Sequence, residues 1–286
     1  GDMKHASKSE LENINNITSF FDIGLSGKIT AITEGIGNYN YLVTTSQGDY
    51  VVKFLVTQKP LGIENDIAIQ NQLASVDIKT STYIKNKNGQ YLYSDKDVNA
   101  VVSQKIDGVV PRRASKGLAF EIGRTLAVFH KHVTALPHPI NGWMNPDMID
   151  IHSEEAIILF TKSLPKGITH GDMHLGNVLV NPKEPDNIYA ILDFEEAGDD
   201  LFVVDLARSI LGVCYSEDEN SLAIELVKAE INGYESVRKL HEDEKMLLPE
   251  AIKYATDACI KWFRENGYER YVEKHRRRAN SFRMPV

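Results

Sequence analysis

"ITHGDMHLGNVLVN", residues 168–181, is the stretch that decides the fold and the chemistry of this chain. It places His170, Asp172, His174 and Asn177 in one short polar segment, directly before the strand-like run "NVLV". A segment of this composition has two interpretations. It is either a pair of metal-binding histidines on a helix, or a catalytic loop that ends in a β-strand.

The metal-binding interpretation rests on the spacing of the two histidines. His170 and His174 are four residues apart, which on a helix would put both imidazoles on one face, as a zinc protease needs. Gly171 and Gly176 interrupt the segment, however, and the residue after His170 is not glutamate. We therefore favour a loop and keep a zinc hydrolase as an alternative.

The catalytic interpretation starts from Asp172 and Asn177, which are five residues apart. A strand, the turn "NPKEPDN" and a second strand lead from them to Asp193. Phosphoryl transfer requires these groups: a carboxylate that accepts the hydroxyl proton, and two oxygen ligands for Mg²⁺. Lys53 in "DYVVKFL" adds the strand-borne lysine that a kinase uses to bind nucleotide phosphates.

Hydrophobic patterns predict an α+β fold. A capping box from Ser9 to Glu12 opens a first helix, and after residue 108 the chain becomes mostly helical around a short β-like island that holds the opening motif. We expect strands at 27–34, 39–46, 49–56, 81–86 and 99–106, with a helix from Pro60 to Leu73, and later helices at 118–133, 216–234 and 250–266. The predicted domains are 1–103 and 104–286.

Composition narrows the class of partners and the compartment. Lys and Arg total 32 against 40 Asp and Glu, for a net charge of -8, which argues against nucleic-acid binding. Cys214 and Cys259 are the only cysteines, so neither a disulfide framework nor a thiol metal site is expected. Without a signal sequence or a membrane-spanning run, we expect a cytoplasmic protein with no membrane partner.

"HGDMHLGN", "ILDF", "VVDLAR" and "YVVKF" together resemble the aminoglycoside phosphotransferase, choline kinase and homoserine kinase superfamily, small-molecule relatives of protein kinases. Residues 35–54 are similar to the nucleotide-loop region of bacterial homoserine kinases. The resemblance runs from about residue 30 to about residue 212. It implies a bilobal protein-kinase-like fold, with a nucleotide-binding N-terminal lobe, a catalytic and acceptor-binding C-terminal lobe, and ATP and Mg²⁺ as cofactors.

The resemblance implies roles for residues of the opening motif. Asp172 would be the catalytic base, or would orient the acceptor hydroxyl, and Asn177 and Asp193 would bind Mg²⁺. His174 would either approach the γ-phosphate or only pack. His170 would hold the loop by hydrogen bonds. Asp205 would cap the helix that begins "DLARS" and brace the loop.

The resemblance also implies a nucleotide site. Lys53 would bind the α- and β-phosphates, with Asp66 as its acidic partner and Glu64 as the alternative. The hairpin over the triphosphate would include Gly35, Gly37, Asn38 and Asn40. The hinge that contacts adenine would include Ser103, Gln104 and Ile106.

Acidic residues gather after Asp193, at 195–200 and again at 217–219. In the family, the acceptor pocket lies beside the first of these stretches, where carboxylates would favour a cationic acceptor. The alternative is that they are solvated charges, as we also expect for the basic run 273–283. We therefore expect an ATP-dependent kinase that phosphorylates a hydroxyl of a small, amine-bearing acceptor, with a non-catalytic nucleotide-binding protein as the alternative.

Overall fold

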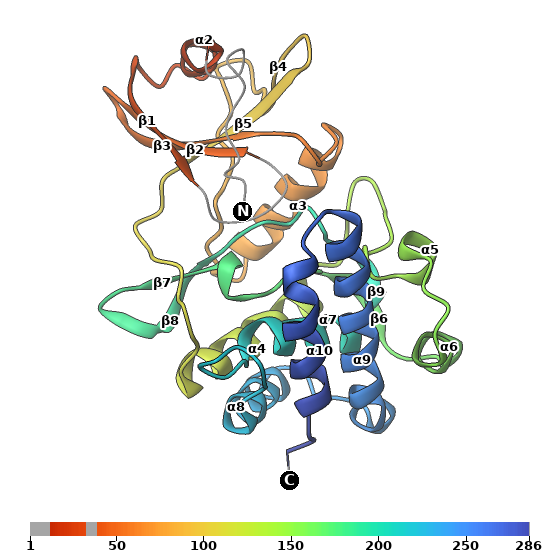
Figure 1. Cartoon of the computed structure of the whole chain (residues 1–286). Coiled ribbons are helices and arrows are strands. Elements are labelled where there is room, and N and C mark those ends of the chain that lie inside the picture. The colour runs from red at the N-terminus through yellow and green to blue at the C-terminus, as the bar shows by residue number, and fades with distance from the viewer. Residues whose placement is uncertain (1–11, 33–38, 286) are drawn as a thin grey trace. The chain divides into compact units, whose positions relative to one another are not determined.

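The computed structural model describes residues 12–32 and 39–285. The chain divides into two compact units, Gly1–Asp107 and Gly108–Val286 (Figure 1). The first is built on an antiparallel sheet and the second is mostly helical. The predicted α+β class is thereby confirmed.

The first unit is a five-stranded antiparallel sheet with the strand order β1-β2-β3-β5-β4. Its elements are α2 (Ile14–Phe20), β1 (Ser26–Ile32), β2 (Tyr39–Thr45), β3 (Gly48–Phe54), α3 (Gly62–Ala74), β4 (Tyr93–Asp95) and β5 (Val98–Gln104). The predicted strands 27–34, 39–46 and 49–56 are β1, β2 and β3, and the predicted helix after Pro60 is α3.

Alternation along β3 decides where Lys53 lies. Val52 and Phe54 are buried in a core with Ile14 and Ile17 of α2, on one face of the sheet. Because successive strand residues point to opposite faces, Lys53 lies on the other face. There Ile63 of α3 packs with neighbours from the sheet in a second, smaller apolar cluster.

Two expectations for the first unit need correction. The predicted strand 81–86 is only a single bridge, between Tyr83 and Ser103, because the Asn86 side chain accepts hydrogen bonds from the Asn88 and Gln90 backbones and turns the chain. On the side of β5 away from β3, the strand that pairs with it is β4, which we did not predict. The first helix begins at Ile14, and Ser9 of its expected capping box lies outside the described residues.

The second unit begins after Asp107. Its elements are α4 (Lys116–His132), α5 (Pro146–Ile149), α6 (Glu154–Thr161), β6 (Lys166–Thr169), η1 (Leu175–Asn177), β7 (Val178–Asn181), β8 (Glu184–Ile191), β9 (Gly198–Leu201), α7 (Phe202–Val213), α8 (Ile224–Glu235), α9 (Glu242–Glu265), η2 (Glu269–Tyr271) and α10 (Val272–Ser281). The helix α7 runs through the core, with nearly all of its residues buried.

Two small antiparallel pairs place the opening motif. The strand β6 pairs with β9 and ends where the polar loop begins, and β7 follows the loop and pairs with β8. Across that hairpin, the Leu192 backbone N–H donates to the Asn177 carbonyl at 2.8 Å. The residue after Leu192 is Asp193, so the hairpin brings the expected metal ligands together.

The helix boundaries of this unit differ from the prediction at two places. The helix α8 begins at Ile224 rather than at 216, because Ser216 accepts and donates hydrogen bonds that close a turn with Ser221. The helix α9 begins at Glu242 and continues through Pro249, although proline usually ends a helix. A capping box between His241 and Glu244 stabilises these extra turns.

The basic run at the C-terminus is partly buried, which corrects the expectation of a fully solvated face. Arg276 and Arg277 of α10 are exposed, but Arg278 is only 6 % exposed. Its guanidinium donates to the backbone carbonyls of Glu219 and Leu211.

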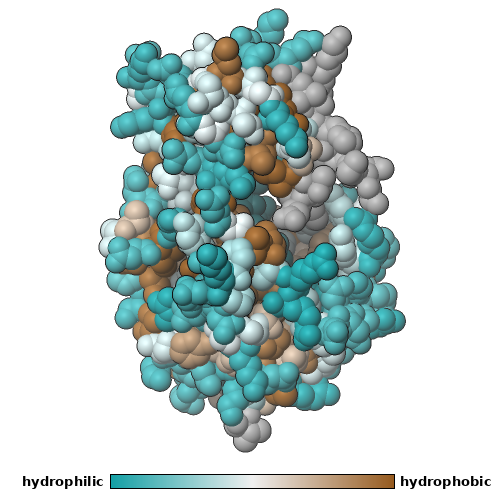
Figure 2. All heavy atoms as spheres, turned by 90° about the vertical axis from the view of Figure 1, so that its left-hand side faces the viewer, coloured by the Kyte–Doolittle hydropathy of each residue, from teal (hydrophilic) through white to brown (hydrophobic). Residues whose placement is uncertain are grey.

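Apolar side chains are scattered over the surface. Figure 2 shows brown, hydrophobic residues interspersed with teal, hydrophilic ones. The most exposed large ones are Leu25, Met246 and Ile157, at 82 %, 65 % and 61 %. Isolated apolar residues of this kind are common on globular proteins. Among residues 12–32 and 39–285, no helix is both long enough and apolar enough to cross a membrane.

Glycines let α4 and α8 pack closely. A Cβ atom at Gly123 of α4 would lie 2.0 Å from the Glu230 carbonyl oxygen, and one at Gly233 of α8 would lie 1.9 Å from that of Phe120. Both distances are far below van der Waals contact. The helices can therefore keep this spacing only if both positions lack a side chain.

We expect Gly233→Ala to lower the free energy of unfolding by about 1–3 kcal/mol, because the methyl group must push the helices apart. Alanine in an unconstrained helix position would instead add about 0.5–1 kcal/mol. Urea unfolding, with Lys228→Ala at an exposed α8 position as the control, measures the difference. A Gly233→Ala protein as stable as the unmodified one would contradict the close packing.

Candidate active site

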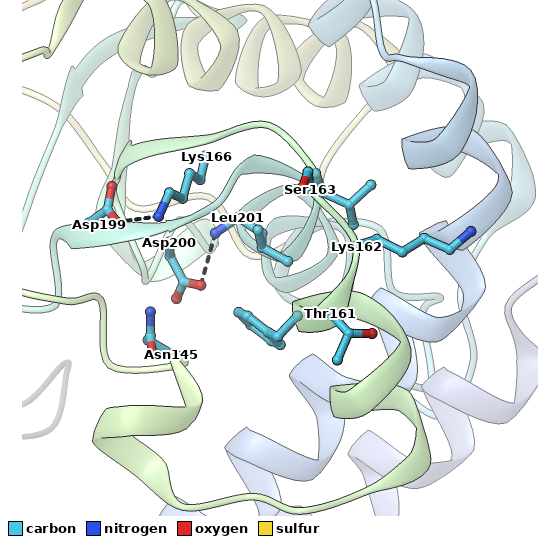
Figure 3. A pocket seen from close by; sticks show the side chains of 10 residues that line it. Asn145, Thr161, Lys162, Ser163, Lys166, Asp199, Asp200 and Leu201 are labelled. Atoms are coloured by element: carbon cyan, nitrogen blue, oxygen red, sulfur yellow. Dashed lines mark hydrogen bonds and ion pairs between the residues drawn. The ribbon is translucent and has the colours of Figure 1, made fainter.

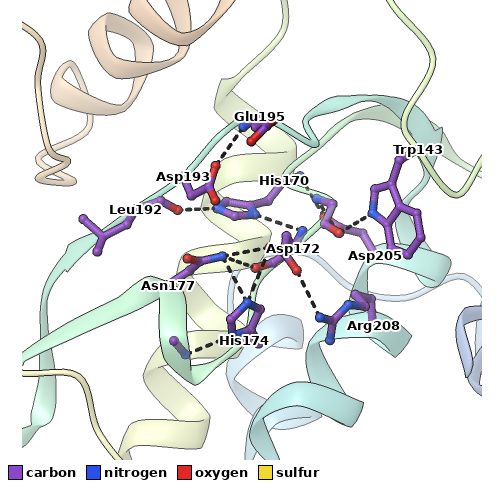
Figure 4. Close-up of polar contacts among 12 residues, drawn as sticks. Trp143, His170, Asp172, His174, Asn177, Leu192, Asp193, Glu195, Asp205 and Arg208 are labelled. Atoms are coloured by element: carbon purple, nitrogen blue, oxygen red, sulfur yellow. Dashed lines mark hydrogen bonds and ion pairs between the residues drawn. The ribbon is translucent and has the colours of Figure 1, made fainter. Parts of the chain in front are cut away.

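The polar loop is held by a buried carboxylate, that of Asp205 on α7. Its Oδ2 accepts a hydrogen bond from the His170 backbone N–H at 3.0 Å, and its Oδ1 accepts one from the Gly171 N–H at 2.9 Å (Figure 4). We expected Asp205 to cap its helix and brace the loop. It braces the loop, but it does not cap α7, which already begins at Phe202.

Asp205 is in turn held by His130 of α4, which is itself bound to Tyr234 of α8. His130 Nε2 lies 2.7 Å from Asp205 Oδ2, and His130 Nδ1 lies 2.7 Å from the hydroxyl of Tyr234. Burial alone would raise the pKa of Asp205, but the hydrogen bond from His130 and the Gly171 N–H hold that pKa below its usual range. Burial lowers the pKa of His130. The pair is therefore an ionised carboxylate beside a neutral imidazole.

His170 stabilises the loop rather than binding a metal. Its Nε2 lies 3.0 Å from the Leu192 carbonyl oxygen, and its Nδ1 accepts a hydrogen bond from the Asp172 N–H at 3.1 Å. Both ring nitrogens are thus used within the protein. No group of three or more histidine, cysteine or acidic side chains suited to a metal occurs in the part of the chain that the structure describes, so nothing there supports zinc.

Both carboxylate oxygens of Asp172 are held in place. Oδ1 accepts from Arg208 Nη2 at 3.0 Å, and Oδ2 accepts from Asn177 Nδ2 at 3.1 Å and lies 3.4 Å from His174 Nε2. Burial acts to raise the pKa of Asp172. His174, Arg208 and His170 outweigh that effect and hold the pKa well below its usual range. Asp172 is therefore an anion, with its side chain still 25 % exposed.

Asn177 and Asp193 each carry a side-chain oxygen that could bind a cation, and the β7-β8 hairpin pairs Asn177 with the residue before Asp193. The Asn177 amide donates to both the carbonyl and the carboxylate of Asp172, which leaves its own Oδ1 facing away from that residue (Figure 4). Asp193 has a left-handed backbone, with φ of 59°, and one carboxylate oxygen accepts from the Glu195 N–H. Magnesium needs few protein ligands, because it keeps waters and binds substrate phosphates. The donor set therefore fits Mg²⁺.

His174 closes the loop on itself. Its Nδ1 accepts from the Gly176 backbone N–H at 3.0 Å, and its Nε2 lies 3.3 Å from Asn177 Nδ2. The ring is 31 % exposed, so it is available to a ligand as well as being held by the loop.

Negative charge gathers around this loop. Burial raises the pKa of Glu196 to about 8, and the charges of Asp172, Glu195 and Asp193 add to that shift. Carboxylates resist ionisation together when no cation lies between them. The site is therefore electrostatically suited to cations.

Asp199 and Asp200 lie farther along, at a pocket of about 340 Å³ beside β6 and β9 (Figure 3). Asp199 pairs with Lys166 at 3.9 Å. Asp200 is 2 % exposed, and in the described residues its Oδ2 has no hydrogen-bond partner. Burial raises its pKa to about 8. The two residues belong to this pocket and not to the contacts around Asp172.

In the first unit, Lys53 joins a buried polar network. Its Nζ donates to the Tyr83 hydroxyl at 2.8 Å and to Gln58 Oε1 at 3.1 Å. Tyr83 and Gln58 both donate to Asp66 Oδ2, at 2.7 and 2.8 Å. Asp66 is 1 % exposed, whereas Glu64 is on the surface. The network therefore connects Lys53 with Asp66.

The other residues that we expect to contact the nucleotide lie on β2 and at the end of β5, apart from three outside the described residues. Asn40 on β2 lies directly opposite Lys53 on β3, so the two share a face of the sheet. Ser103 and Gln104 end β5, and Ile106 follows just before the point where the two units divide. Gly35, Gly37 and Asn38 lie outside the described residues.

Several site residues were missed by sequence reasoning. Arg208 follows Asp205 by three residues on one helix, so helical spacing could have placed both beside the loop. Tyr83, His130 and Trp143, whose Nε1 donates to the Gly171 carbonyl, have no local sequence signal.

Comparison with known proteins identifies the family. The model of the phosphotransferase enzyme family (APH) matches residues 28–240, which include Lys53 and the whole loop. The chain belongs to this family. It is therefore a phosphotransferase that acts on hydroxyl acceptors, as the motifs predicted.

Sequence relatives are homoserine kinases. The enzyme from Granulibacter bethesdensis is 24 % identical over 272 residues, covering 85 % of this chain and 83 % of the relative. That from Paramagnetospirillum magneticum is 26 % identical over 271 residues, with coverage of 85 % and 81 %. Identities of 24 % and 26 % do not establish that this chain acts on the same substrate.

Solved structures agree in fold. An amicoumacin kinase, solved with AMP-PNP and Ca²⁺, has a TM-score of 0.73 at 14 % identity and covers 96 % of this chain and 95 % of its own. An aminopropanol kinase has a TM-score of 0.71 at 17 % identity, with coverage of 93 % and 95 %. The choline kinase of Streptococcus pneumoniae has a TM-score of 0.59 at 16 % identity, with coverage of 94 % and 98 %. These matches confirm the predicted kinase-like fold of the phosphotransferase family.

We expect Asp205→Asn to lower the free energy of unfolding by about 3 kcal/mol, because an amide N–H₂ replaces an ionised acceptor that faces buried donors. Urea unfolding followed by circular dichroism measures the change. Asp107→Asn, at a side chain that is 93 % exposed, is the matched control and should be nearly neutral. Equal midpoints for the two variants would show that Asp205 does not hold the loop.

Proposed function

We propose that the protein transfers the γ-phosphoryl group of ATP to a hydroxyl of a small, amine-bearing molecule. The observation that best supports this function is the arrangement around Asp172. The Asp172 carboxylate is held ionised by Arg208 and Asn177, and Asn177 pairs across the hairpin with the residue before Asp193. This arrangement provides an anion for the acceptor hydroxyl and two oxygen ligands for a metal, on one loop and one hairpin.

Asp172 would orient the acceptor and receive its proton. The acceptor oxygen forms a bond to the γ-phosphorus, while the bond from that phosphorus to the β–γ bridging oxygen breaks and ADP leaves. The hydroxyl proton passes to the Asp172 carboxylate. Since its low pKa makes Asp172 a weak base, its main contribution is to hold the hydroxyl in line.

Asn177 Oδ1 and the Asp193 carboxylate would bind Mg²⁺. When bound, the ion neutralises charge on the nucleotide phosphates. The loop supports this role because the Asn177 amide is fixed by Asp172, and one oxygen of the Asp193 carboxylate is fixed by the Glu195 N–H. His174 would lie beside the transferred phosphoryl group.

The first unit would bind the nucleotide. Lys53 would contact the α- and β-phosphates, with Asp66 setting its position through Tyr83 and Gln58. Asn40 would lie over the phosphates with Gly35, Gly37 and Asn38. Ser103, Gln104 and Ile106 would contact the adenine. Unit 1–103 would thus be the nucleotide lobe, and 104–286 the catalytic and acceptor lobe.

An amine-bearing acceptor suits the charge of the catalytic loop. Glu196 lies near both Asp172 and Glu195, and a protonated amine beside it would oppose the raised pKa of its carboxyl group and favour the ionised form. The relatives include homoserine kinases, and the structural neighbours include an aminopropanol kinase and a choline kinase. The acceptors in these names all carry a hydroxyl and a nitrogen. A non-catalytic protein is less favoured, since it has no need for an Asp172 carboxylate that is held at both oxygens.

We expect Asp172→Asn to lower kcat by about 10²–10⁴-fold, because the amide neither holds the hydroxyl as the carboxylate does nor accepts its proton. ADP release from Mg-ATP, with homoserine, aminopropanol or choline as acceptor, measures kcat. Asp147→Asn on the exposed helix α5 is the matched control. Undiminished turnover by the Asp172→Asn enzyme would rule out this mechanism.

We expect Lys53→Met to raise the KM for ATP and to lower kcat, because the phosphates lose their cationic partner. A change of at least about tenfold in kcat/KM for ATP is expected from one lost charged contact. Lys87→Met, at a side chain that is 81 % exposed, controls for the loss of a lysine. Identical ATP kinetics for both variants would contradict the role of Lys53.

A further inference from the structure

Arg208 makes direct contact with the proposed catalytic carboxylate. The side chain extends from α7, and its Nη2 donates to Asp172 Oδ1 at 3.0 Å (Figure 4). The side chain of Arg208 is only 10 % exposed. The guanidinium is therefore a buried cation, and it donates a hydrogen bond to one oxygen of Asp172.

Stability alone does not explain an arginine at this place. Its Nε and Nη1 are buried, and neither has a hydrogen-bond partner within the described ranges 12–32 and 39–285. Burying unsatisfied donors is unfavourable, and an apolar side chain of similar volume usually packs better than a buried charge. The local structure nevertheless makes room for it, because a Cβ at Gly212 would lie 2.8 Å from Nη1.

Arg208 is also not needed to attach the loop to α7. Asp205 of the same helix already binds the backbone N–H groups of His170 and Gly171. What Arg208 adds is a contact with the side chain of Asp172. The contact that distinguishes Arg208 therefore affects the orientation of the Asp172 carboxylate.

The contacts of Asp172 leave few directions open. An ionised carboxylate has about four acceptor positions. Arg208 occupies one on Oδ1, and Asn177 occupies one on Oδ2 with His174 close by. With both oxygens fixed, the carboxylate plane is set, and an incoming hydroxyl meets an acceptor lone pair of defined direction.

We infer that Arg208 is a positioning residue for phosphoryl transfer: by fixing Oδ1 of Asp172, it directs the carboxylate toward the hydroxyl of the acceptor. The inference rests on the proposed function, because it needs Asp172 to act on the acceptor. Arg208 itself touches neither substrate. Its effect should therefore depend entirely on the presence of the Asp172 carboxylate.

The test is a double-mutant cycle measured as Mg-ATP turnover with the best of homoserine, aminopropanol and choline. We expect Arg208→Met to lower kcat by about 10–100-fold, as a misplaced catalytic group does, with little change in the KM for ATP. In the Asp172→Asn background, Arg208→Met should change kcat by less than about twofold. A second readout is the amount of phosphorylated acceptor per ADP released, which should fall because a misdirected Asp172 no longer favours the acceptor over water.

Arg208→Lys keeps the charge but loses the planar donor group. We expect it to retain part of the activity, between Arg208→Met and the unmodified enzyme, and it decides the question if Arg208→Met does not fold. Arg124→Met, at a partly exposed position on α4, is the matched control and should leave both readouts unchanged.

Two results would overturn the inference. One is unmodified kcat and coupling in both Arg208 variants. The other is an equal loss from Arg208→Met with and without the Asp172 carboxylate, which would show that Arg208 acts elsewhere. Failure of the proposed function looks different, since Asp172→Asn would then retain full turnover.

Discussion

The second unit depends on one buried anion, the carboxylate of Asp205. It accepts hydrogen bonds from two successive backbone N–H groups of the catalytic loop, and His130, itself bound to Tyr234, holds it from the other side. Burying a carboxylate is costly unless its acceptor positions are filled, and here they are filled by the loop itself. The same contacts that satisfy Asp205 therefore fix the backbone from which Asp172 projects.

From this anchor the chemistry of the site follows in short steps. The loop places Asp172 where Arg208 and Asn177 each hold one oxygen, and the β7-β8 hairpin returns the chain so that Asp193 lies next to Asn177. Burial, together with the charges of the surrounding carboxylates, raises the pKa of Glu196. A site with this excess of negative charge is completed by cations, which suits both a magnesium ion and a protonated amine.

Local spacing was enough to predict which polar residues lie on neighbouring elements. Asp172 and Asn177 lie on one loop and Asp193 follows one hairpin, so their proximity depends only on neighbouring elements. The β-rich run "DYVVKFL" predicted the strand that carries Lys53. The partners of these residues could not be predicted in the same way. Tyr83 and His130 reach Lys53 and Asp205 from segments far apart in the sequence. The predicted helix boundaries were wrong where tertiary contacts override local preference. One example is Pro249, through which α9 continues.

The most direct test of the account is acceptor-dependent phosphoryl transfer by the purified protein, followed by phosphorus NMR with Mg-ATP. A pair of acceptors that differ only in the amine, such as aminopropanol and propanediol, tests whether the enzyme prefers a positively charged acceptor. The account predicts that a hydroxyl compound with an amine is phosphorylated, with one ADP formed per product, and that its neutral counterpart reacts far more slowly. Binding of Mg-ATP without transfer to homoserine, choline, aminopropanol or an aminoglycoside would contradict it.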